Sequence, residues 1–412
     1  MIQLGQGELI LVGCPLGLLA WQSEYLPDRS VVIVEEPERI REHDLVRVAE
    51  QNPVVDRLVA IEYRNGFDAD DLLARDPDLA GATLVVPGLE YAVGAAARLA
   101  TRLGLPGAGL PAGDIFRSKY RMRELAAANG IANPAYRLVN DIAGAEAFFD
   151  EFGGRCVLKP VNRQASLGVQ FIDDRAQISV GWSHTADLDD AGPSAPGVLI
   201  EQALSGPEFS VELLVSAGRV VFGNVTAKRL VPGRFPVELG HTVPAPITPA
   251  RYDSLLASAR QLAAAAEFGT GVLHSEWIVQ DDVPTLVECA ARLPGDSISA
   301  LISMAYEFRF IEAYLRLLRG DELSLPDEAV EAAAIEFVTA EPGTVVAADG
   351  VAEAANLPGV VDVQITVGPG ATISALTSSN DRIGQVMALG YTPARAQASA
   401  QAAVAAIRVT VS

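Results

Sequence analysis

Short apolar runs alternate with polar or helical stretches over the first hundred residues of the chain. Four of these runs have the length of a β-strand, at 8–13, 31–35, 58–62 and 82–87. Such alternation is typical of a parallel sheet covered by helices. An alanine-rich helix is expected at 90–104, and a link rich in glycine and proline follows at 107–113. The pattern therefore predicts an N-terminal α/β unit over 1–112.

The middle of the chain, 113–328, mixes amphipathic helices with strands of alternating polarity. Helices are expected at 115–129, 143–152, 252–268 and 297–319. Strands are expected at 136–138, 156–159, 168–172, 198–201, 209–215 and 218–226. We interpret the polar segment 174–197 as a surface insertion. The remainder, 329–412, predicts a small α+β unit, with strands at 333–338, 359–367 and 371–375, a strand or short helix at 381–389 and a helix at 392–407.

The segment 274–290 predicts two short strands joined by a polar turn. Glu276 and Glu288 lie symmetrically about that turn, so the hairpin places them opposite each other on one face. Opposed residues lie roughly 5 Å apart at Cβ, and two carboxylates at that spacing repel unless a cation lies between them. Such oxygen ligands suit Mg²⁺, and Arg292 adds a positive group beside them. The alternative is that both glutamates are solvated sheet residues.

Composition limits the classes of partner. The chain has 412 residues and a formal net charge of −21, which argues against nucleic acid or an anionic membrane as the main partner. It contains no apolar run of 18 residues and no charged leader, so we expect no membrane span and a cytoplasmic location. Cys14, Cys156 and Cys289 have no metal-site spacing and indicate reduced thiols.

Lysine is rare in this chain, and only Lys119, Lys159 and Lys228 occur among 31 basic residues. An ammonium group on a flexible stem suits a phosphate oxygen, so these lysines are candidates for phosphate binding. The alternative is that they are ordinary surface residues. Lys159 ends a predicted strand, and the loop after it contains Ser166 and Gly168, whose backbone N–H groups can fold over phosphates.

Two further segments fit a nucleotide and a polar substrate. A buried strand ends at Glu201, where backbone groups can bind an adenine edge, and Glu208 can bind ribose hydroxyls. Both glutamates can equally be solvated turn residues. A long loop rich in proline and glycine carries Arg234, Glu238 and His241, and its length and paired charges indicate a functional loop. The first turn of the chain, GCPLG, lacks the dinucleotide-binding pattern.

In their order along the chain, these motifs resemble the ATP-grasp superfamily. The features are a helix with a lysine, VLKP, a Ser/Gly loop, IEQALSGPEFSVE and HSEW…TLVECAARLPGD, over about 110–320. The AARLPGD ending, the FPVELGH loop and the VGPGATI…DRIGQVMALG segment resemble the L-amino-acid ligase branch. The resemblance implies an ATP-grasp fold of mixed α/β and α+β class. Its parts are the parallel N-terminal domain, a lid over about 114–200, a central antiparallel-sheet ATP-binding domain and the C-terminal α+β domain.

The resemblance also implies roles for individual residues. Those that match the ATP site are Lys119, Lys159, Ser166, Gly168, Glu201, Gln202, Ala203 and Glu208. Glu276 and Glu288 match the ligands of Mg²⁺, a site that also suits Mn²⁺. Arg292 matches the arginine near the transferred phosphate. Ala290 stands where many members of the superfamily have Asn, which leaves the number of metal ions open.

The activity implied is an ATP-dependent, ADP-forming carboxylate–amine ligase that joins amino acids or similar small molecules through an acyl phosphate. The candidate catalytic residues are Arg292, Lys159 and His274. The candidate substrate-binding residues are Arg234, Glu238, His241 and Arg292. Each of the two histidines is expected to orient a substrate, accept the amine proton or serve the structure alone. The alternatives are a carboxylase-type or purine-pathway ATP-grasp ligase and a nucleotide-binding scaffold without catalysis. A homodimer is an expectation from the family alone.

Overall fold

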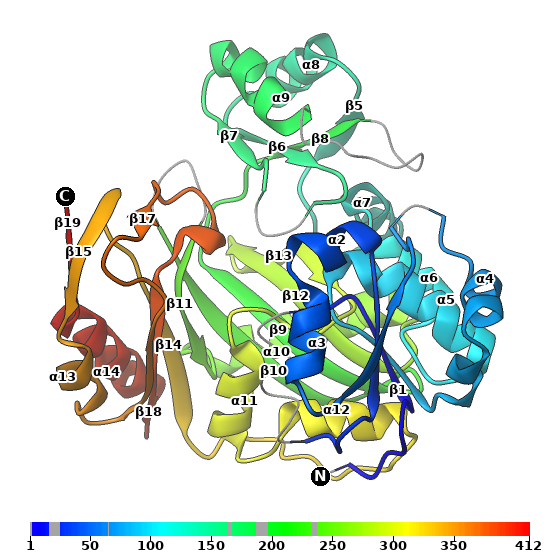
Figure 1. The fold of residues 1–412 in the computed structure, drawn as a ribbon. Helices are drawn as coiled ribbons and strands as arrows, with labels where there is room; N and C mark the ends of the chain where they lie inside the picture. The colour runs from blue at the N-terminus through cyan, green and yellow to red at the C-terminus, as the bar shows by residue number, and fades with distance from the viewer. Residues whose placement is uncertain (1, 16–24, 65, 164–166, 187–196, 232–236) are drawn as a thin grey trace.

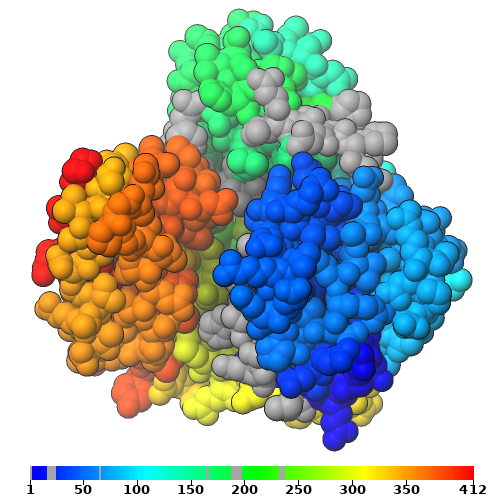
Figure 2. Space-filling model, viewed as in Figure 1, coloured from blue at the N-terminus to red at the C-terminus, as the bar shows by residue number. Residues whose placement is uncertain are grey.

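The computed structural model describes residues 2–15, 25–64, 66–163, 167–186, 197–231 and 237–412. The molecule has four parts: an N-terminal sheet with its helices, a lid unit, a central sheet and a C-terminal unit (Figure 1). Figure 2 shows that the surface is hollowed between the N-terminal unit, in blue, and the C-terminal unit, in orange, beneath the lid in green. The expected parallel N-terminal sheet, lid, central antiparallel sheet and C-terminal unit are all present.

The N-terminal unit is a parallel sheet, as the alternation of apolar and polar segments predicts. Its strand order is β3–β2–β1–β4, with β1 Leu9–Val12, β2 Val31–Glu35, β3 Val55–Ala60 and β4 Leu84–Pro87. β1 and β2 are buried along their whole length because both faces of the sheet are covered. Its helical elements are α2 Pro37–Glu42, α3 Leu45–Gln51, α4 Ala69–Arg75, η1 Pro77–Gly81, η2 Glu90–Ala92, α5 Val93–Leu103 and α6 Leu110–Ile115.

The lid is a four-stranded antiparallel sheet with two helices packed on it. Its strand order is β5–β8–β6–β7, with β5 Tyr136–Val139, β6 Cys156–Pro160, β7 Gln170–Ile172 and β8 Val198–Gln202. The helical elements are α8 Ile142–Phe152, η3 Arg175–Gln177 and α9 Ile178–Ala186, and α7 Lys119–Ala128 precedes them. The interpretation of 174–197 as a surface insertion is wrong for α9, because Ile178, Gly181 and Thr185 are buried on its inner face. Residues 187–196 lie outside the described residues.

The central unit is built on strands that pair antiparallel. They are β9 Glu208–Ser216, β10 Arg219–Leu230, β11 Glu238–Val243, β12 Gly271–Gln280 and β13 Val283–Ala290. Its helices are α10 Pro249–Ala265, α11 Ile298–Tyr306 and α12 Phe310–Leu318. The single helix predicted over 297–319 is wrong, because Glu307 has a left-handed backbone with φ 53° and ends α11. This break lets the rings of Tyr306, Phe308 and Phe310 pack around Phe222.

The central sheet continues into the C-terminal unit. The eight-stranded order is β13–β12–β9–β10–β11–β14–β18–β16, so strands from beyond residue 328 extend the same sheet. The added elements are β14 Ala332–Val338, β15 Gly343–Asp349, α13 Val351–Ala355, β16 Val360–Ile365, β17 Thr372–Ile373, η4 Ser379–Asp381, β18 Gly384–Gly390, α14 Pro393–Ala406 and β19 Arg408–Val411. The segment 381–389 is therefore largely a strand. The domain limits at 112 and 328 stay our proposal.

One hydrophobic core joins three of the units. It contains Leu9 and Leu84 of the N-terminal sheet, Phe310 of α12, and Ile335 and Met387 of the strands shared with the C-terminal unit. Burial of this much apolar surface fixes the units against each other, so residues they contribute to one site keep their relative positions. Among the described residues, no helix combines the length and apolar character needed to cross a membrane.

Candidate active site

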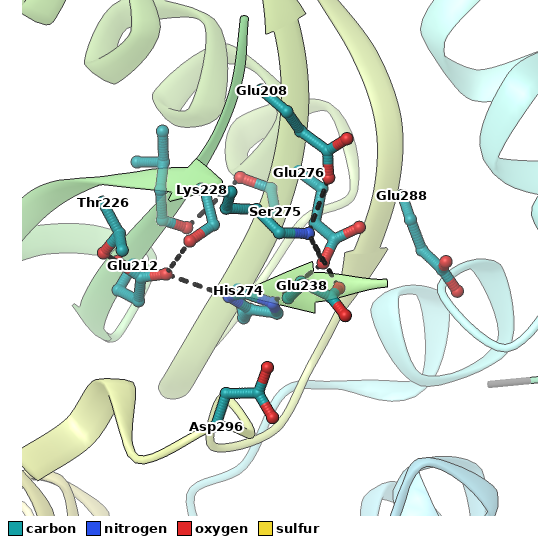
Figure 3. Close-up of polar contacts among 12 residues, drawn as sticks. Glu208, Glu212, Thr226, Lys228, Glu238, His274, Ser275, Glu276, Glu288 and Asp296 are labelled. Carbon is teal, nitrogen blue, oxygen red and sulfur yellow. Dashed lines mark hydrogen bonds and ion pairs between the residues drawn. The ribbon is translucent and has the colours of Figure 1, made fainter. Parts of the chain in front are cut away.

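The two glutamates of the predicted hairpin lie opposite each other, and a β-bulge is the reason. β12 and β13 are joined by the tight turn of Asp281 and Asp282, both with positive φ. The register set by that turn pairs Gln280 with Val283, but it shifts between Glu276 and Trp277. The extra residue brings Glu288 opposite Glu276. Both carboxylates therefore project from the same face of the sheet (Figure 3).

Each of these carboxylates already has a lysine as partner. Lys119 Nζ lies 2.8 Å from Glu288 Oε1, and Lys228 Nζ lies 2.9 Å from Glu276 Oε1. Lys119 begins α7, whose N-cap is Ser118, and its ammonium also donates to the Arg163 carbonyl oxygen at 2.5 Å. The lysine that opens α7 thus connects the lid loop to the hairpin.

The ammonium group of Lys228 lies among three carboxylates. Its ammonium lies 2.6 Å from Glu208, 2.9 Å from Glu276 and 3.4 Å from Glu238, and its side chain is 3% exposed. Burial alone would lower the pKa of Lys228, but the three carboxylates raise it well above its ordinary value. One buried cation therefore holds together strands β9, β10, β11 and β12. The sequence indicated Lys228 as a candidate but assigned it no partner.

A second buried cluster lies at the base of the lid. The Glu201 carboxylate accepts two hydrogen bonds from Arg123, at 2.6 and 3.1 Å. It also forms an ion pair with Lys159 at 2.7 Å. Burial alone would raise the pKa of Glu201, but these cations lower it to about 2. The backbone N–H groups of Gln202 and Ala203 donate to Ala135 and Arg155. The Glu201 side chain and the N–H groups of Gln202 and Ala203 are therefore all engaged within the protein.

His274 is held by a buried polar network below the hairpin. Its Nδ1 lies 3.0 Å from Glu212 and its Nε2 lies 3.5 Å from Glu276. Glu212 also accepts hydrogen bonds from Ser210 and Thr226. Burial alone would lower the pKa of His274, but hydrogen bonds and charge from Glu212 and Glu276 raise it to about 9. Carboxylates therefore engage both ring nitrogens of His274, which favours a positioning role.

Arg292 is oriented by a residue from the N-terminal unit. Its Nε donates to Glu90 Oε2 at 2.8 Å, and its Nη1 donates to the Leu293 carbonyl oxygen. Glu90 is 4% exposed and also lies 3.6 Å from Arg117. Glu90 and Arg292 are 202 residues apart in sequence. Spacing along the chain therefore gave no signal for this pair.

The predicted substrate residues meet groups from the C-terminal unit. His241 Nε2 lies 2.9 Å from Asp296 Oδ2, and Arg382 donates to both oxygens of Asp296 at 2.9 and 2.5 Å. Burial alone would raise the pKa of Asp296, but hydrogen bonds from His241 and Arg382 hold it well below its ordinary value. Ser379 donates to Glu238 Oε2 at 2.6 Å. Asp296, Ser379 and Arg382 were not identified from the sequence.

Two cavities meet at the hairpin. The first has an open volume of ≈ 100 Å³ and is lined by predicted ATP-site residues, among them Lys119, Lys159, Glu201, Gln202 and Glu208. The second has an open volume of ≈ 190 Å³ and is lined by His241, His274, Arg292, Asp296 and Ser379. Both cavities share Lys228, Glu238, Glu276 and Glu288. The described lining of the first cavity includes Leu167, Val169 and Leu204 but neither Gly168 nor Ala203. Ser166 and Arg234 lie outside the described residues.

The carboxylates of this site suit Mg²⁺, which needs few protein ligands, better than a metal ion whose ligands all come from the protein. In the part of the chain that the structure describes, no group of three or more His, Cys, Asp or Glu side chains could hold a metal ion. Magnesium commonly takes one or two carboxylates and completes its shell with water and phosphate oxygens. The paired carboxylates of Glu276 and Glu288 match that pattern. Ala290, which also lines the second cavity, adds no ligand.

Comparison with known proteins agrees with this geometry. A family model described as the ATP-grasp domain matches residues 152–300. A second model, described as L-amino acid ligase C-terminal domain 2, matches residues 336–412. The resemblance to the L-amino-acid ligase branch is thereby confirmed at the C-terminal unit.

Individual relatives match most of the chain. An uncharacterised protein of Sinorhizobium fredii, y4rH, is 28% identical over 82% of this chain and 70% of its own length. A phosphoribosylamine–glycine ligase of Caulobacter vibrioides is 29% identical over 74% of this chain and 77% of its own length. The crystal structure of an L-amino acid ligase from Bacillus licheniformis covers 100% of both chains with a TM-score of 0.76 at 18% identity. That likeness shows a common fold.

Proposed function

We propose that this protein is an ATP-dependent, ADP-forming carboxylate–amine ligase that joins two amino acids or amino-acid-like molecules. The observation that carries this proposal is the pair of cavities with a common wall of Lys228, Glu238, Glu276 and Glu288. A nucleotide in one cavity and two small substrates in the other would meet at that wall. The match of the C-terminal unit to L-amino acid ligases supports the same class of reaction.

The first cavity suits ATP because Lys119 and Lys159 line it together with the end of β8 at Glu201 and Gln202. Lys119 and Lys159 are proposed to bind phosphate oxygens as point charges. The backbone around Glu201–Ala203 is proposed to bind adenine, and Glu208 to bind ribose. Ser166 and Gly168 belong to the loop proposed to fold over the phosphates. Exclusion of water by that loop matters, because water would hydrolyse an activated acyl group.

Glu276 and Glu288 are proposed to hold Mg²⁺, or Mn²⁺ in its place. When bound, the metal would neutralise part of the charge on the phosphoryl group that is transferred. Lys119 and Lys228, now paired with these carboxylates, would then be available to phosphate oxygens. Charge is therefore balanced in the site with either set of partners.

The second cavity suits a carboxylate and an amine. Arg292, fixed by Glu90, is proposed to bind the substrate carboxylate, whose oxygen attacks the γ-phosphorus of ATP and displaces ADP. The product of this step is an acyl phosphate, and Lys159 and Arg292 offset its charge. Glu238, which lies 3.4 Å from Lys228 and accepts a hydrogen bond from Ser379, is proposed to bind a substrate ammonium group as well. Attack of the second amine on the acyl carbon then releases phosphate and forms the amide.

The test is ADP release from Mg-ATP with amino acids supplied singly and in pairs, together with product masses. We expect turnover that requires two amino acids and a product equal to their summed mass minus water. ADP release that depends on bicarbonate or on a ribosyl amine would favour the carboxylase-type or purine-pathway alternative. ATP binding without ADP release in every mixture would contradict the proposal and favour a scaffold.

A further inference from the structure

We propose that Ser379 of the C-terminal unit determines the preference of this protein for α-amino acids over plain carboxylic acids, because it holds the Glu238 carboxylate toward the acid substrate. This inference rests on the proposed ligase function, in which Glu238 binds a substrate ammonium group. The Ser379 hydroxyl donates to Glu238 Oε2 at 2.6 Å, although the two residues are 141 positions apart in sequence. Ser379 is therefore a positioning residue, which acts on the substrate through Glu238.

The Glu238 carboxylate lies where negative charges outnumber the nearby cation. Glu208, Glu238 and Glu276 share the ammonium of Lys228, and the distance to Glu238, 3.4 Å, is the longest of the three (Figure 3). The Glu238 side chain is 15% exposed and lines both cavities. A second ammonium group at this carboxylate, supplied by a substrate, would reduce the repulsion among the three carboxylates. A plain carboxylic acid supplies no such group.

The hydrogen bond from Ser379 directs Glu238 to one of the two cavities. Among the described residues, Ser379 belongs to the lining of the second cavity and not to that of the first. A carboxylate oxygen accepts more than one hydrogen bond, so Oε2 can bind a substrate N–H group while it accepts from Ser379. Without this hydrogen bond, rotation about the side-chain bonds of Glu238 would let its carboxylate turn toward the first cavity. Ser379 thus keeps the carboxylate where the substrates are proposed to bind.

Arg382 fixes the backbone of both residues. Its Nε donates to the Ser379 carbonyl oxygen at 2.8 Å, and its Nη1 donates to the Glu238 carbonyl oxygen at 3.4 Å. The same guanidinium donates to both oxygens of Asp296 and lies over the Phe337 ring, with its carbon 3.7 Å from the ring centroid. A planar guanidinium with several partners holds them in a fixed arrangement. The contact between the Ser379 hydroxyl and Glu238 is therefore preorganised.

The turn that carries Ser379 is stabilised by its other hydroxyl groups. Asp381 Oδ2 accepts hydrogen bonds from the backbone N–H groups of Thr377 and Ser378, at 2.9 and 2.8 Å, and from both of their hydroxyl groups. Ser378 is the N-cap of η4 and forms a capping box with Asp381. Two of three consecutive hydroxyl groups thus bind within the turn, whereas that of Ser379 binds a residue of the central unit. This difference indicates that Ser379 serves the cavity and not the turn.

The test compares an amino acid with the same acid lacking its α-amino group, of which alanine and propanoate are one pair. The amino acid used is one that supports ADP release by the wild type. Hydroxylamine serves as the amine, so that the acid is the only source of an α-ammonium group, and hydroxamate formation from Mg-ATP is measured. We expect Ser379→Ala to raise the KM for the amino acid. The ratio of kcat/KM between the amino acid and the plain acid should fall roughly 10-fold, because a hydrogen bond to a charged group commonly contributes that factor or more.

Two variants control for the loss of the side chain itself. Ser379→Thr keeps the hydroxyl group and should retain most of the wild-type ratio between the two acids. Ser374→Ala changes an exposed serine of the same unit and should leave that ratio at the wild-type value.

A double-mutant cycle tests whether Ser379 acts through Glu238. Glu238→Gln removes the charge that attracts the ammonium group, so it should lower the ratio at least as far as Ser379→Ala does. Addition of Ser379→Ala to Glu238→Gln should then cause little further fall, because the group through which Ser379 acts is already neutral. A further fall as large as that in the wild-type background would overturn the inference.

Other outcomes contradict the inference in distinguishable ways. An equal fall for both acids in Ser379→Ala would assign the residue to the structure of the turn. A wild type that uses the two acids equally well would leave the ligase function standing and refute the selectivity proposed here. Absence of hydroxamate and ADP from the wild type with every acid would refute the ligase function itself, and this inference with it.

Discussion

Glu201→Gln tests whether buried charge holds the lid to the rest of the molecule. The Glu201 side chain is 2% exposed, and its partners Arg123 and Lys159 are 0% and 11% exposed. Arg123 also donates to the Val287 carbonyl oxygen at 2.7 Å, so the cluster joins β8 of the lid to α7 and β13. The substitution keeps the shape of the side chain but leaves two buried cations without their anion.

Two arguments give the same magnitude. Removal of one partner of a buried ion pair costs about 3–5 kcal/mol. Independently, the pKa of Glu201 falls from its ordinary 4.5 to about 2, which corresponds to about 3 kcal/mol of folding free energy at pH 7. A carboxyl group whose pKa is lower in the folded than in the unfolded protein stabilises the fold at pH values above its unfolded pKa. This stabilisation is lost as the pH falls through its folded pKa. At pH 3 it is therefore reduced to about 1 kcal/mol.

The assay is urea unfolding of wild type and variant at pH 7 and pH 3, followed by circular dichroism. Glu151→Gln is the matched control, because Glu151 is an exposed lid residue paired with Arg137 at 2.7 Å. We expect the control to stay within about 0.5 kcal/mol of wild type at both pH values. A loss in Glu201→Gln no larger than the control, or one that does not shrink at pH 3, would refute the reasoning.

Three further predictions follow from contacts in the site and the N-terminal turn. Glu288→Gln should lower ADP formation by roughly 10²-fold or more while its circular dichroism spectrum stays that of the wild type, and full activity would exclude Glu288 as a metal ligand. Lys228→Met should cost about 3 kcal/mol in urea unfolding at pH 7, because it removes the buried cation that Glu208, Glu238 and Glu276 share. Glu208→Gln in the same chain should recover part of that loss, and no recovery would contradict the charge argument. Gly88→Ala should destabilise the fold by about 1–3 kcal/mol, because a Cβ at this position overlaps the carbonyl oxygen of Gly13. A Cβ on Gly81 meets no atom within 4 Å, so Gly81→Ala should unfold like the wild type.

The sequence predicted the elements of this fold well wherever a strand is buried or a helix is amphipathic. The apolar runs of β1, β2 and β4 are such cases, because solvent is excluded from both faces of the sheet. The prediction failed for a helix in which the exposed polar residues gather on one face. In α9 Ser179, Ser183 and His184 lie on the exposed face, and the inner face packs on β6 and β7 of the lid.

The hairpin shows a prediction that was correct for a reason the sequence does not display. Symmetry about the turn pairs Glu276 with Glu288, but the tight turn of Asp281 and Asp282 sets a register one residue away from that pairing. Only the bulge beside Trp277 restores it. Trp277 is fully buried, and its ring nitrogen donates to Ser275. No local propensity distinguishes this bulge from a regular ladder.

The partners of the site residues were the part that sequence could not supply. Arg123 and Glu90 are ordinary charged residues in their own segments, and their contacts with Glu201 and Arg292 span 78 and 202 residues. Such contacts follow from how the units pack, and spacing within a segment carries no information about that. Lysine scarcity was the exception, since it indicated Lys228 as a placed charge before its three carboxylates were known.

The second cavity, proposed for the substrates, depends on more units than the first, proposed for the nucleotide. Arg292 is held by Glu90 of the N-terminal unit, while Asp296 and Glu238 are held by Arg382 and Ser379 of the C-terminal unit. The lid contributes Lys159 and Glu201 to the nucleotide cavity but lines no part of the second cavity among the described residues. Movement of the lid would therefore change access to the nucleotide without displacing the groups proposed to bind the acid and the amine. The continuous core that joins the N-terminal sheet to α12 and β14 keeps those groups fixed. An acyl phosphate must react with the amine before water hydrolyses it, and such a reaction requires a site whose groups are fixed.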